Sequence, residues 1–338
     1  MREPSRRVVV TQRFFDDASV AILESAGCEV VLAELPPGQA DGGLSQGELV
    51  DLLQGAGGWI VGHARVTREL LSDLPGLLAI SRRGVGYERV DLAAARDLGR
   101  VVTIAAGGNE ASVADQAIGM MLAVGRRFRE AQGQMIGGSW SILMGTDLYR
   151  RTVGVVGLGR IGRSVVQRLR GFEAEILVAT SRPDPAYAAA AGVRFVELPA
   201  LLRESDYVTL HAPLTPETRH LIDADSIAAM RPGAFVINTA RGGLVSDTDL
   251  LAALKTGRLG GAGLDVFESE SDPSLKPVTD ELIALPNVVA APHAGASTRE
   301  GLERTNMIAA QCVVDVFEGR DPPPECVVAD GRPGRGRR

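Results

Sequence analysis

The sequence lacks three features that would point to particular classes of protein. It has only three cysteines, Cys28, Cys312 and Cys326, which lie far apart in the chain and do not have the spacing of metal ligands. No apolar run approaches the ~18 residues that a membrane-spanning helix needs. Basic residues are not in excess, because the formal net charge is −6, which argues against a nucleic-acid partner. We therefore expect a cytoplasmic protein with reduced thiols, without a metal, a membrane or a nucleic acid as partner.

The length and the order of the segments indicate two α/β domains. A chain of 338 residues suits two domains of roughly 100–200 residues each. Candidate strands alternate with candidate helices, which predicts parallel sheets covered on both faces. In the first part, the expected strands are Val8–Thr11, Glu29–Ala33, Gly58–Gly62, Leu77–Arg82 and Arg100–Ile104, and the expected helices are Asp17–Ala26, Ser45–Gln54, Arg68–Leu71 and Leu92–Leu98.

A long helix, Ser112–Gln132, is expected between the two parts. The expected strands of the second part are Val153–Gly157, Ile176–Thr180, Tyr207–His211, Ala234–Thr239, Gly261–Leu264 and Val288–Ala291. A last helix, Glu300–Glu318, has no sheet of its own, so we expect it to pack back on the first part. The short, basic and glycine-containing end, 331–338, is expected to be a disordered tail.

One expected strand leads directly into a glycine-spaced turn. The chain reads Gly157-Leu-Gly-Arg-Ile-Gly162 and continues into an amphipathic helical stretch. Gly157 permits a tight turn, Gly159 lets the backbone approach a pyrophosphate, and Gly162 lets the helix pack on its strand. Free N–H groups at the start of the helix face the anion. This layout predicts a dinucleotide site in the second domain.

Three polar residues follow apolar strands of the same domain. They are Arg241, Glu270 and His293, and each comes shortly after a strand end, where doubly wound sheets bind their ligands. Hydride transfer to a 2-oxo acid requires a bidentate clamp for the carboxylate, a proton donor for the carbonyl oxygen, and an anion that keeps the imidazole charged and oriented. An arginine, a histidine and a glutamate supply these three groups.

Seven motifs stand in order between Gly58 and Gly319. They read Arg83-Gly-Val-Gly-Tyr-Glu-Arg-Val-Asp, Asn109-Glu-Ala-Ser-Val-Ala-Asp, Gly157-Leu-Gly-Arg-Ile-Gly, Leu210-His-Ala-Pro-Leu-Thr-Pro-Glu-Thr, Asn238-Thr-Ala-Arg-Gly-Gly, Leu264-Asp-Val-Phe-Glu-Ser-Glu and Pro292-His-Ala-Gly-Ala-Ser-Thr. Together they resemble the D-isomer-specific 2-hydroxyacid dehydrogenase family, which includes D-3-phosphoglycerate dehydrogenase, glyoxylate/hydroxypyruvate reductase and D-lactate dehydrogenase.

The resemblance implies a role for each matching residue. Arg241 would bind the substrate carboxylate and carbonyl oxygen, His293 would be the acid/base, and Glu270 would pair with it. The loop Gly84-Val85-Gly86 would bind the carboxylate from the other domain, with Asn109 near the hinge. Asp265 would meet the nicotinamide carboxamide. The implied cofactor-binding set is Gly157, Gly159, Arg160, Ile161, Gly162, Thr180, Ser181, Arg182, His211, Ala212, Thr218, Thr239, Ala240, Asp265 and Gly295.

The resemblance also implies the domain organisation. Two Rossmann-like, doubly wound domains are expected, with the active site in the cleft between them. The substrate domain would comprise 1–105 and 296–330, and the dinucleotide domain 106–295. The family commonly forms homodimers through the dinucleotide domain. Because the sequence ends soon after the last expected helix, we expect no regulatory domain of the kind that some phosphoglycerate dehydrogenases carry.

The cofactor strand departs from the pattern of the NAD-specific relatives. Those relatives end their second strand with an aspartate that accepts both ribose hydroxyls and repels a 2′-phosphate. Here Thr180 stands at that position, followed by Ser181 and Arg182, which suits a 2′-phosphate and favours NADP(H). The alternative is an enzyme that prefers NAD(H), in which Asp184 reaches the ribose.

The substrate is left open between two classes. Arg82 and Arg83 stand before the expected carboxylate loop, and His63 and Arg65 follow an earlier strand. If two of these side chains line the site, the substrate carries a second anionic group such as phosphate or phosphonate; otherwise a small 2-oxo acid such as glyoxylate or hydroxypyruvate is expected. Two other functions stay open, namely a nucleotide-sensing corepressor of the same fold and a dehydrogenase of a phosphorus-centred substrate such as phosphite.

Overall fold

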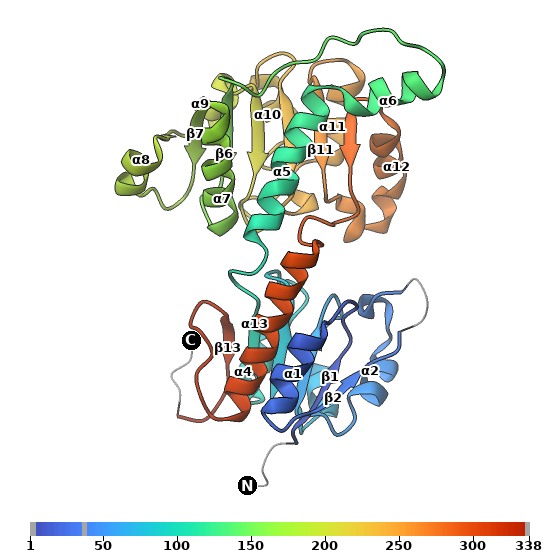
Figure 1. Cartoon of the computed structure of the whole chain (residues 1–338), viewed down its shortest axis with the longest axis vertical. Coiled ribbons are helices and arrows are strands. Elements are labelled where there is room, and N and C mark those ends of the chain that lie inside the picture. Colours follow the sequence, from blue (N-terminus) through green and yellow to red (C-terminus); the bar gives the residue numbers. More distant parts are fainter. Residues whose placement is uncertain (1–4, 36–38, 335–338) are drawn as a thin grey trace. The chain divides into compact units, whose positions relative to one another are not determined.

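The computed structural model describes residues 5–35 and 39–334, and the chain divides into two compact α/β units (Figure 1). Unit 1 comprises Met1–Asn109 and Ser297–Arg338, and unit 2 comprises Glu110–Ala296. The boundary lies slightly later than the expected one at 105/106. The reason is that residues 105–108 bond to unit 1, where Ala105 N–H donates to Gly84 O (3.1 Å) and Arg304 Nε donates to Gly108 O (3.0 Å).

Unit 1 contains a six-stranded sheet with the order β13-β5-β4-β3-β1-β2, in which only β13 is antiparallel to its neighbour. Its strands are β1 (Arg7–Val10), β2 (Glu29–Leu32), β3 (Gly58–Val61), β4 (Ala79–Arg82), β5 (Val101–Ile104) and β13 (Val327–Asp330). Its helices are α1 (Asp17–Ser25), α2 (Gln46–Leu53), α3 (Arg68–Asp73), α4 (Leu92–Asp97) and α13 (Arg299–Phe317), with a short 3-10 turn η1 (Asp41–Gly43).

Both ends of the chain contribute to unit 1. Val313 and Phe317 of α13 pack in one apolar cluster with Val8 of β1, which confirms that the last helix packs back on the first part. The expected disordered tail is wrong for its first residues, because Gly331 N–H donates to Arg100 O (2.9 Å) and Arg332 forms an ion pair with Asp330 (2.7 Å). Residues 335–338 of the expected tail lie outside the described residues.

Unit 2 contains a seven-stranded parallel sheet with the order β12-β11-β10-β9-β6-β7-β8. Its strands are β6 (Thr152–Val156), β7 (Glu175–Ala179), β8 (Arg194–Phe195), β9 (Tyr207–Leu210), β10 (Phe235–Asn238), β11 (Gly261–Leu264) and β12 (Val288–Ala290). Its helices are α5 (Glu110–Gly125), α6 (Phe128–Ile136), α7 (Arg160–Leu169), α8 (Pro185–Ala191), α9 (Leu198–Glu204), α10 (Ala224–Ala229), α11 (Asp247–Lys255) and α12 (Lys276–Ala284), and its 3-10 turns are η2 (Arg170–Phe172), η3 (Gly242–Leu244), η4 (Glu268–Glu270) and η5 (Pro273–Leu275).

The strand order of unit 2 reverses between β6 and β9, so the carboxyl ends of these two strands form a switch point for ligand binding. Strands β6, β9 and β10 are almost wholly buried, as expected of parallel strands covered on both faces. Helix α5 lies across one face of this sheet (Figure 1). The expected site residues of unit 2 stand at or beyond the carboxyl ends of its strands, in the segments that follow them, or in the first turn of α7.

The expected helix Ser112–Gln132 is wrong as a single element. It is divided into α5 and α6, because Arg127 adopts a left-handed conformation (φ +54°) between them. The carbonyl oxygen of Gly125 accepts a hydrogen bond from Thr146 N–H (2.8 Å) in place of a helical one. Among the described residues, no helix has the length and apolar character of a membrane span, and no three potential ligands come together for a metal ion.

Candidate active site

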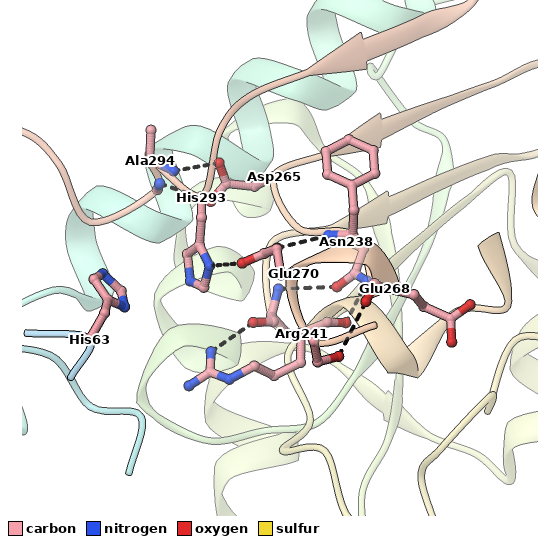
Figure 2. Close-up of polar contacts among 12 residues, drawn as sticks. His63, Asn238, Arg241, Asp265, Glu268, Glu270, His293 and Ala294 are labelled. Carbon is pink, nitrogen blue, oxygen red and sulfur yellow. Dashed lines mark hydrogen bonds and ion pairs between the residues drawn. The ribbon is translucent and has the colours of Figure 1, made fainter. Parts of the chain in front are cut away.

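A histidine and a glutamate contact each other beyond the neighbouring strands β11 and β12 (Figure 2). His293 Nδ1 lies 2.7 Å from Glu270 Oε2, and Glu270 Oε1 accepts a hydrogen bond from Phe267 N–H (2.9 Å). Burial raises the pKa of Glu270, but the hydrogen bond and charge of His293, the N–H of Phe267 and the charge of Arg241 together outweigh it, so the net pKa lies below its ordinary value. Glu270 is therefore ionised at neutral pH and fixes Nδ1 of the imidazole.

Arg241 lies beyond the end of β10, the next strand of the sheet. The side chain of the buried Asn238 holds this turn, because its amide donates to Arg241 O (2.8 Å) and its oxygen accepts from Ala240 N–H (3.1 Å). Arg241 Nη1 donates to Ala240 O (2.7 Å). The charge of Arg241 also contributes to lowering the pKa of Glu270. Unit 2 thus brings the three expected catalytic residues to one edge of its sheet.

Asp265 has a positioning role that the sequence did not reveal. Its buried carboxylate accepts hydrogen bonds from the N–H groups of Ala294 and Gly295 (both 2.8 Å), and its carbonyl oxygen accepts one from His293 N–H (2.8 Å). Burial raises the pKa of Asp265, and the two N–H groups oppose that rise. The residue therefore fixes the turn in which His293 adopts a left-handed conformation (φ +53°). Its contact with a nicotinamide remains a prediction.

The turn after β6 has the shape that a pyrophosphate requires. Gly157 is left-handed (φ +94°), and a Cβ on it would lie only 2.8 Å from Ala212 N. A Cβ on Gly162 would overlap the carbonyl oxygen of Gly157, so this helix packs closely on its strand. In contrast, a Cβ on Gly159 meets open space, at the N-terminus of the ten-residue helix α7 that begins with Arg160 and Ile161. This cradle fits a dinucleotide.

Two buried polar atoms, just after the ends of β9 and β10, support the same fit. Among the described residues, His211 Nδ1 and Thr239 Oγ1 are buried without a hydrogen-bond partner, although buried polar groups normally have one. Burial lowers the pKa of His211 to about 3, so its ring is neutral, and Nε2 lies 2.9 Å from Thr209 Oγ1. Both are residues that the resemblance assigns to the cofactor. Thr218 differs, because its hydroxyl group donates to Pro213 O (2.7 Å) and holds its own loop.

The loop after β7 carries the expected determinants of cofactor choice. Thr180 is half-buried, Ser181 and Arg182 are exposed, and Arg182 N–H donates to Thr180 Oγ1 (3.3 Å). Asp184, the alternative ribose ligand, instead caps α8 by accepting from Tyr187 N–H (3.1 Å). It also pairs with Arg163 Nη2 (3.4 Å).

Unit 1 has a pocket of about 400 Å³ that contains two of the expected substrate residues, Arg83 and His63. Arg83 is half-buried, and its Nη1 donates to the carbonyl oxygen of Arg13, another lining residue (3.1 Å). Burial lowers the pKa of Arg83, and the charge of Asp41 opposes this shift. Arg82 is buried in the sheet and Arg65 is exposed, and neither lines this pocket.

The expected carboxylate loop follows Arg83 directly. Among the described residues, the N–H groups of Gly84, Val85 and Gly86 have no hydrogen-bond acceptor, which makes them available to an anion. Asn109 is buried just before the start of α5.

Comparison with known proteins agrees with this geometry. Residues 118–295 match the family model of the D-isomer specific 2-hydroxyacid dehydrogenase NAD-binding domain. The chain is 36% identical to D-3-phosphoglycerate dehydrogenase of Methanocaldococcus jannaschii, over 93% of this chain and 58% of that enzyme, so it spans little more than half of that relative's length. It is 37% identical to glyoxylate reductase of Thermococcus litoralis, over 77% of this chain and 80% of that enzyme.

A solved structure is similar throughout. The crystal structure of the TT0316 protein from Thermus thermophilus has a TM-score of 0.84 and 36% sequence identity, and the match covers 96% of this chain and all of that one. The chain belongs to the D-isomer-specific 2-hydroxyacid dehydrogenase family.

Proposed function

We propose that the chain is an NAD(P)-dependent dehydrogenase that transfers a hydride between a nicotinamide cofactor and a small D-2-hydroxy acid or its 2-oxo acid. The observation that carries this proposal is the 2.7 Å contact between His293 and Glu270 beside Arg241, in a unit whose glycine cradle fits a dinucleotide. The relatives named D-3-phosphoglycerate dehydrogenase and glyoxylate reductase support the reaction class. When bound, the nicotinamide ring supplies or accepts the hydride.

The site residues then carry out proton transfer and substrate binding. Because Glu270 holds Nδ1 of His293, we assign proton transfer to Nε2, which protonates the carbonyl oxygen during reduction. The anionic Glu270 favours the charged imidazole that this step requires. Arg241 binds the substrate carboxylate through its planar guanidinium group and polarises the carbonyl. In unit 1, the N–H groups of Gly84–Gly86 are available to an anion.

We further propose that the substrate carries a second anionic group, bound in the pocket of unit 1. Two arginines, Arg13 and Arg83, line this pocket, against one acidic residue, Asp41. That carboxylate is already bound, because it accepts hydrogen bonds from the N–H groups of Gly62 and His63 (both 2.7 Å). The walls are otherwise partly apolar, with Phe14, Leu35 and Leu302 among the lining residues. Such a pocket suits a short carbon chain that ends in a phosphate or carboxylate.

The variant Arg83→Met tests this substrate class. We expect it to lower kcat/KM about ten- to a hundred-fold for a 2-oxo acid with a distal anion, because it removes a charge-assisted contact of about 1.5–3 kcal/mol. 3-Phosphohydroxypyruvate and 2-oxoglutarate separate distal phosphate from distal carboxylate, and glyoxylate, which has neither, should be unaffected. The matched control is Arg65→Met, which removes an exposed arginine outside the pocket.

Equal kinetics of wild type and Arg83→Met on all three acids would contradict the second anionic group and leave glyoxylate or hydroxypyruvate as the substrate class. The same assay with phosphite tests the phosphorus-centred alternative. A protein that binds NADPH or NADH but oxidises or reduces none of these compounds would instead be a nucleotide-sensing binding protein. No observation in the structure favours that function over the enzyme.

We propose that the protein is a homodimer and that a second copy covers an apolar segment of unit 2. Ile136, Trp140, Ile142 and Met144 are 80–97% exposed within nine residues of chain, on and after α6. A monomer rarely exposes so many large apolar side chains together.

The three buried cysteines have free thiols, which supports the cytoplasm as a reducing location.

The variant Ile142→Glu is expected to convert the dimer to a monomer, because it buries a charge in the proposed interface. Light scattering coupled to size-exclusion chromatography measures the mass directly. The control Ile283→Glu changes another exposed isoleucine of unit 2, on α12, and should leave the mass unchanged. A wild-type protein that is monomeric at micromolar concentration would contradict the proposal.

A further inference from the structure

The 3-10 turn that carries Glu270 holds a second glutamate with a histidine partner of its own. His220 Nε2 lies 2.6 Å from Glu268 Oε1, much as His293 Nδ1 lies 2.7 Å from Glu270 Oε2. The second pair differs in burial, because the side chain of Glu268 is 6% exposed and that of Glu270 is 40% exposed. A buried carboxylate is stable only where hydrogen bonds and charges compensate it. The position of Glu268 is therefore closely fixed.

Two hydrogen bonds in opposite directions connect Glu268 to the start of α11. Asp247 N–H donates to Glu268 Oε2 (3.0 Å), and Glu268 N–H donates to Asp247 Oδ2 (2.9 Å). Both residues are buried. Such a reciprocal pair leaves the turn little freedom to move relative to the helix.

The same cluster contacts the turn that carries Arg241. The backbone N–H of His220 donates to Gly243 O (2.7 Å), while the ring of His220 contacts Glu268. The two turns are also in direct contact, because a Cβ on Gly242 would lie 2.7 Å from Glu268 N and still closer to the carbonyl group of Phe267. Figure 2 shows Glu268 beside the turn of Glu270. The buried glutamate thus lies where the two catalytic turns meet.

We propose that Glu268, held by Asp247 and His220, is a positioning residue that sets the place of Glu270 and thereby of the imidazole of His293. This inference rests on the proposed function of Glu270 and His293. Glu268 does not touch the imidazole of His293 itself; it acts by fixing the turn Glu268–Glu270, whose last residue makes the 2.7 Å contact.

The charges around the cluster are consistent with this role. Burial raises the pKa of Asp247 to about 7, the backbone N–H of Glu268 opposes the rise, and the charges of Glu268 and Glu270 add to it. His220 Nε2 and Arg219 Nη2, at 2.6 and 3.5 Å, both face Oε1 of Glu268.

A double-mutant cycle separates positioning from general stabilisation. Glu268→Ala is expected to lower kcat for reduction of the 2-oxo acid about ten- to a hundred-fold, with KM for the cofactor changed less than about threefold, because the glycine cradle is untouched. In a Glu270→Gln background the same substitution should lower kcat by less than about threefold. Residues that act through one another are non-additive, whereas independent stability effects add. Glu268→Gln, which keeps an acceptor for Asp247 N–H, should recover part of the rate.

The control is Glu281→Gln on α12, which removes an exposed carboxylate paired with Lys255 of α11 and should not change kcat. Thermal unfolding checks that each variant is folded; if Glu268→Ala is not, the cycle is run with Glu268→Gln. Additive losses in the cycle would overturn the positioning role alone. A Glu270→Gln variant with the wild-type rate would instead overturn the proposed role of Glu270, and the positioning role with it.

Discussion

Replacing Arg241 with lysine is expected to lower kcat/KM for the 2-oxo acid at least ~100-fold. Lysine keeps the positive charge but loses the planar guanidinium group that binds a carboxylate through two parallel hydrogen bonds. The expected loss corresponds to roughly 3 kcal/mol of transition-state stabilisation. Little compensation is available, because Asn238 holds the backbone of Arg241 (2.8 Å) and Gly242 leaves no room for the turn to shift.

The cofactor dissociation constant separates a local effect from misfolding. It should barely change in Arg241→Lys, since the glycine cradle after β6 is formed by other residues. Arg231→Lys is the matched control, because Arg231 belongs to the same unit and pairs with Asp206 (2.9 Å). Steady-state kinetics and cofactor titration of both variants are sufficient. A near wild-type Arg241→Lys would mean that Arg241 does not bind the substrate.

The fold could be predicted from the sequence wherever a strand is an apolar run between turns. Gly261–Leu264 has the expected bounds, and β9 and β10 lie within theirs, because parallel strands covered on both faces have a continuous apolar pattern. The two-residue β8 was not predicted, since its pairing with β7 depends on the fold and not on its own pattern. β13 was missed for the same reason, because it joins the sheet of unit 1 from the far end of the chain.

The helix break between α5 and α6 shows a different limit. The pattern around Arg127 is compatible with a continuous helix, and the break depends on a bond from Thr146, which is distant in the sequence. Local propensity cannot reveal such a tertiary contact.

The residues of the candidate site could likewise be predicted only in part. Arg241, Glu270 and His293 could be selected because each follows a strand of one sheet, and strand ends of a parallel sheet lie together. The cluster around Glu268 could not be predicted from the sequence, because its partners Asp247 and His220 are 21 and 48 residues away along the chain. Asp184, the alternative ribose ligand, caps α8 with its side chain. Capping is a local signal, since Pro185 stands at the first helical position, where proline is favoured.

The loop after β7 carries the prediction about cofactor choice. We propose NADP(H) as the preferred cofactor, because no acidic residue stands at the end of β7 to repel a 2′-phosphate, and the exposed Arg182 provides a guanidinium group beside Thr180. The nearest candidate acid, Asp184, is occupied by the N–H of Tyr187 and by Arg163. Arg163 thus brings a second guanidinium group to this loop. Its guanidinium carbon also lies 4.1 Å from the centre of the Tyr187 ring.

The double variant Thr180→Asp with Arg182→Ala is expected to reverse the cofactor preference. A contact between Arg182 and the 2′-phosphate contributes about 1.5–3 kcal/mol, and each 1.4 kcal/mol is a factor of ten, so wild type should favour NADPH about ten- to a hundred-fold. The aspartate restores an acceptor for the ribose hydroxyls and a charge that repels the phosphate, and the alanine removes the phosphate partner. Comparing kcat/KM with NADPH and NADH measures the change, with Arg170→Ala, an exposed arginine after α7, as the control that should leave the ratio unchanged. A wild-type enzyme that favours NADH would show instead that Arg182 faces away from the cofactor and that another group holds the ribose.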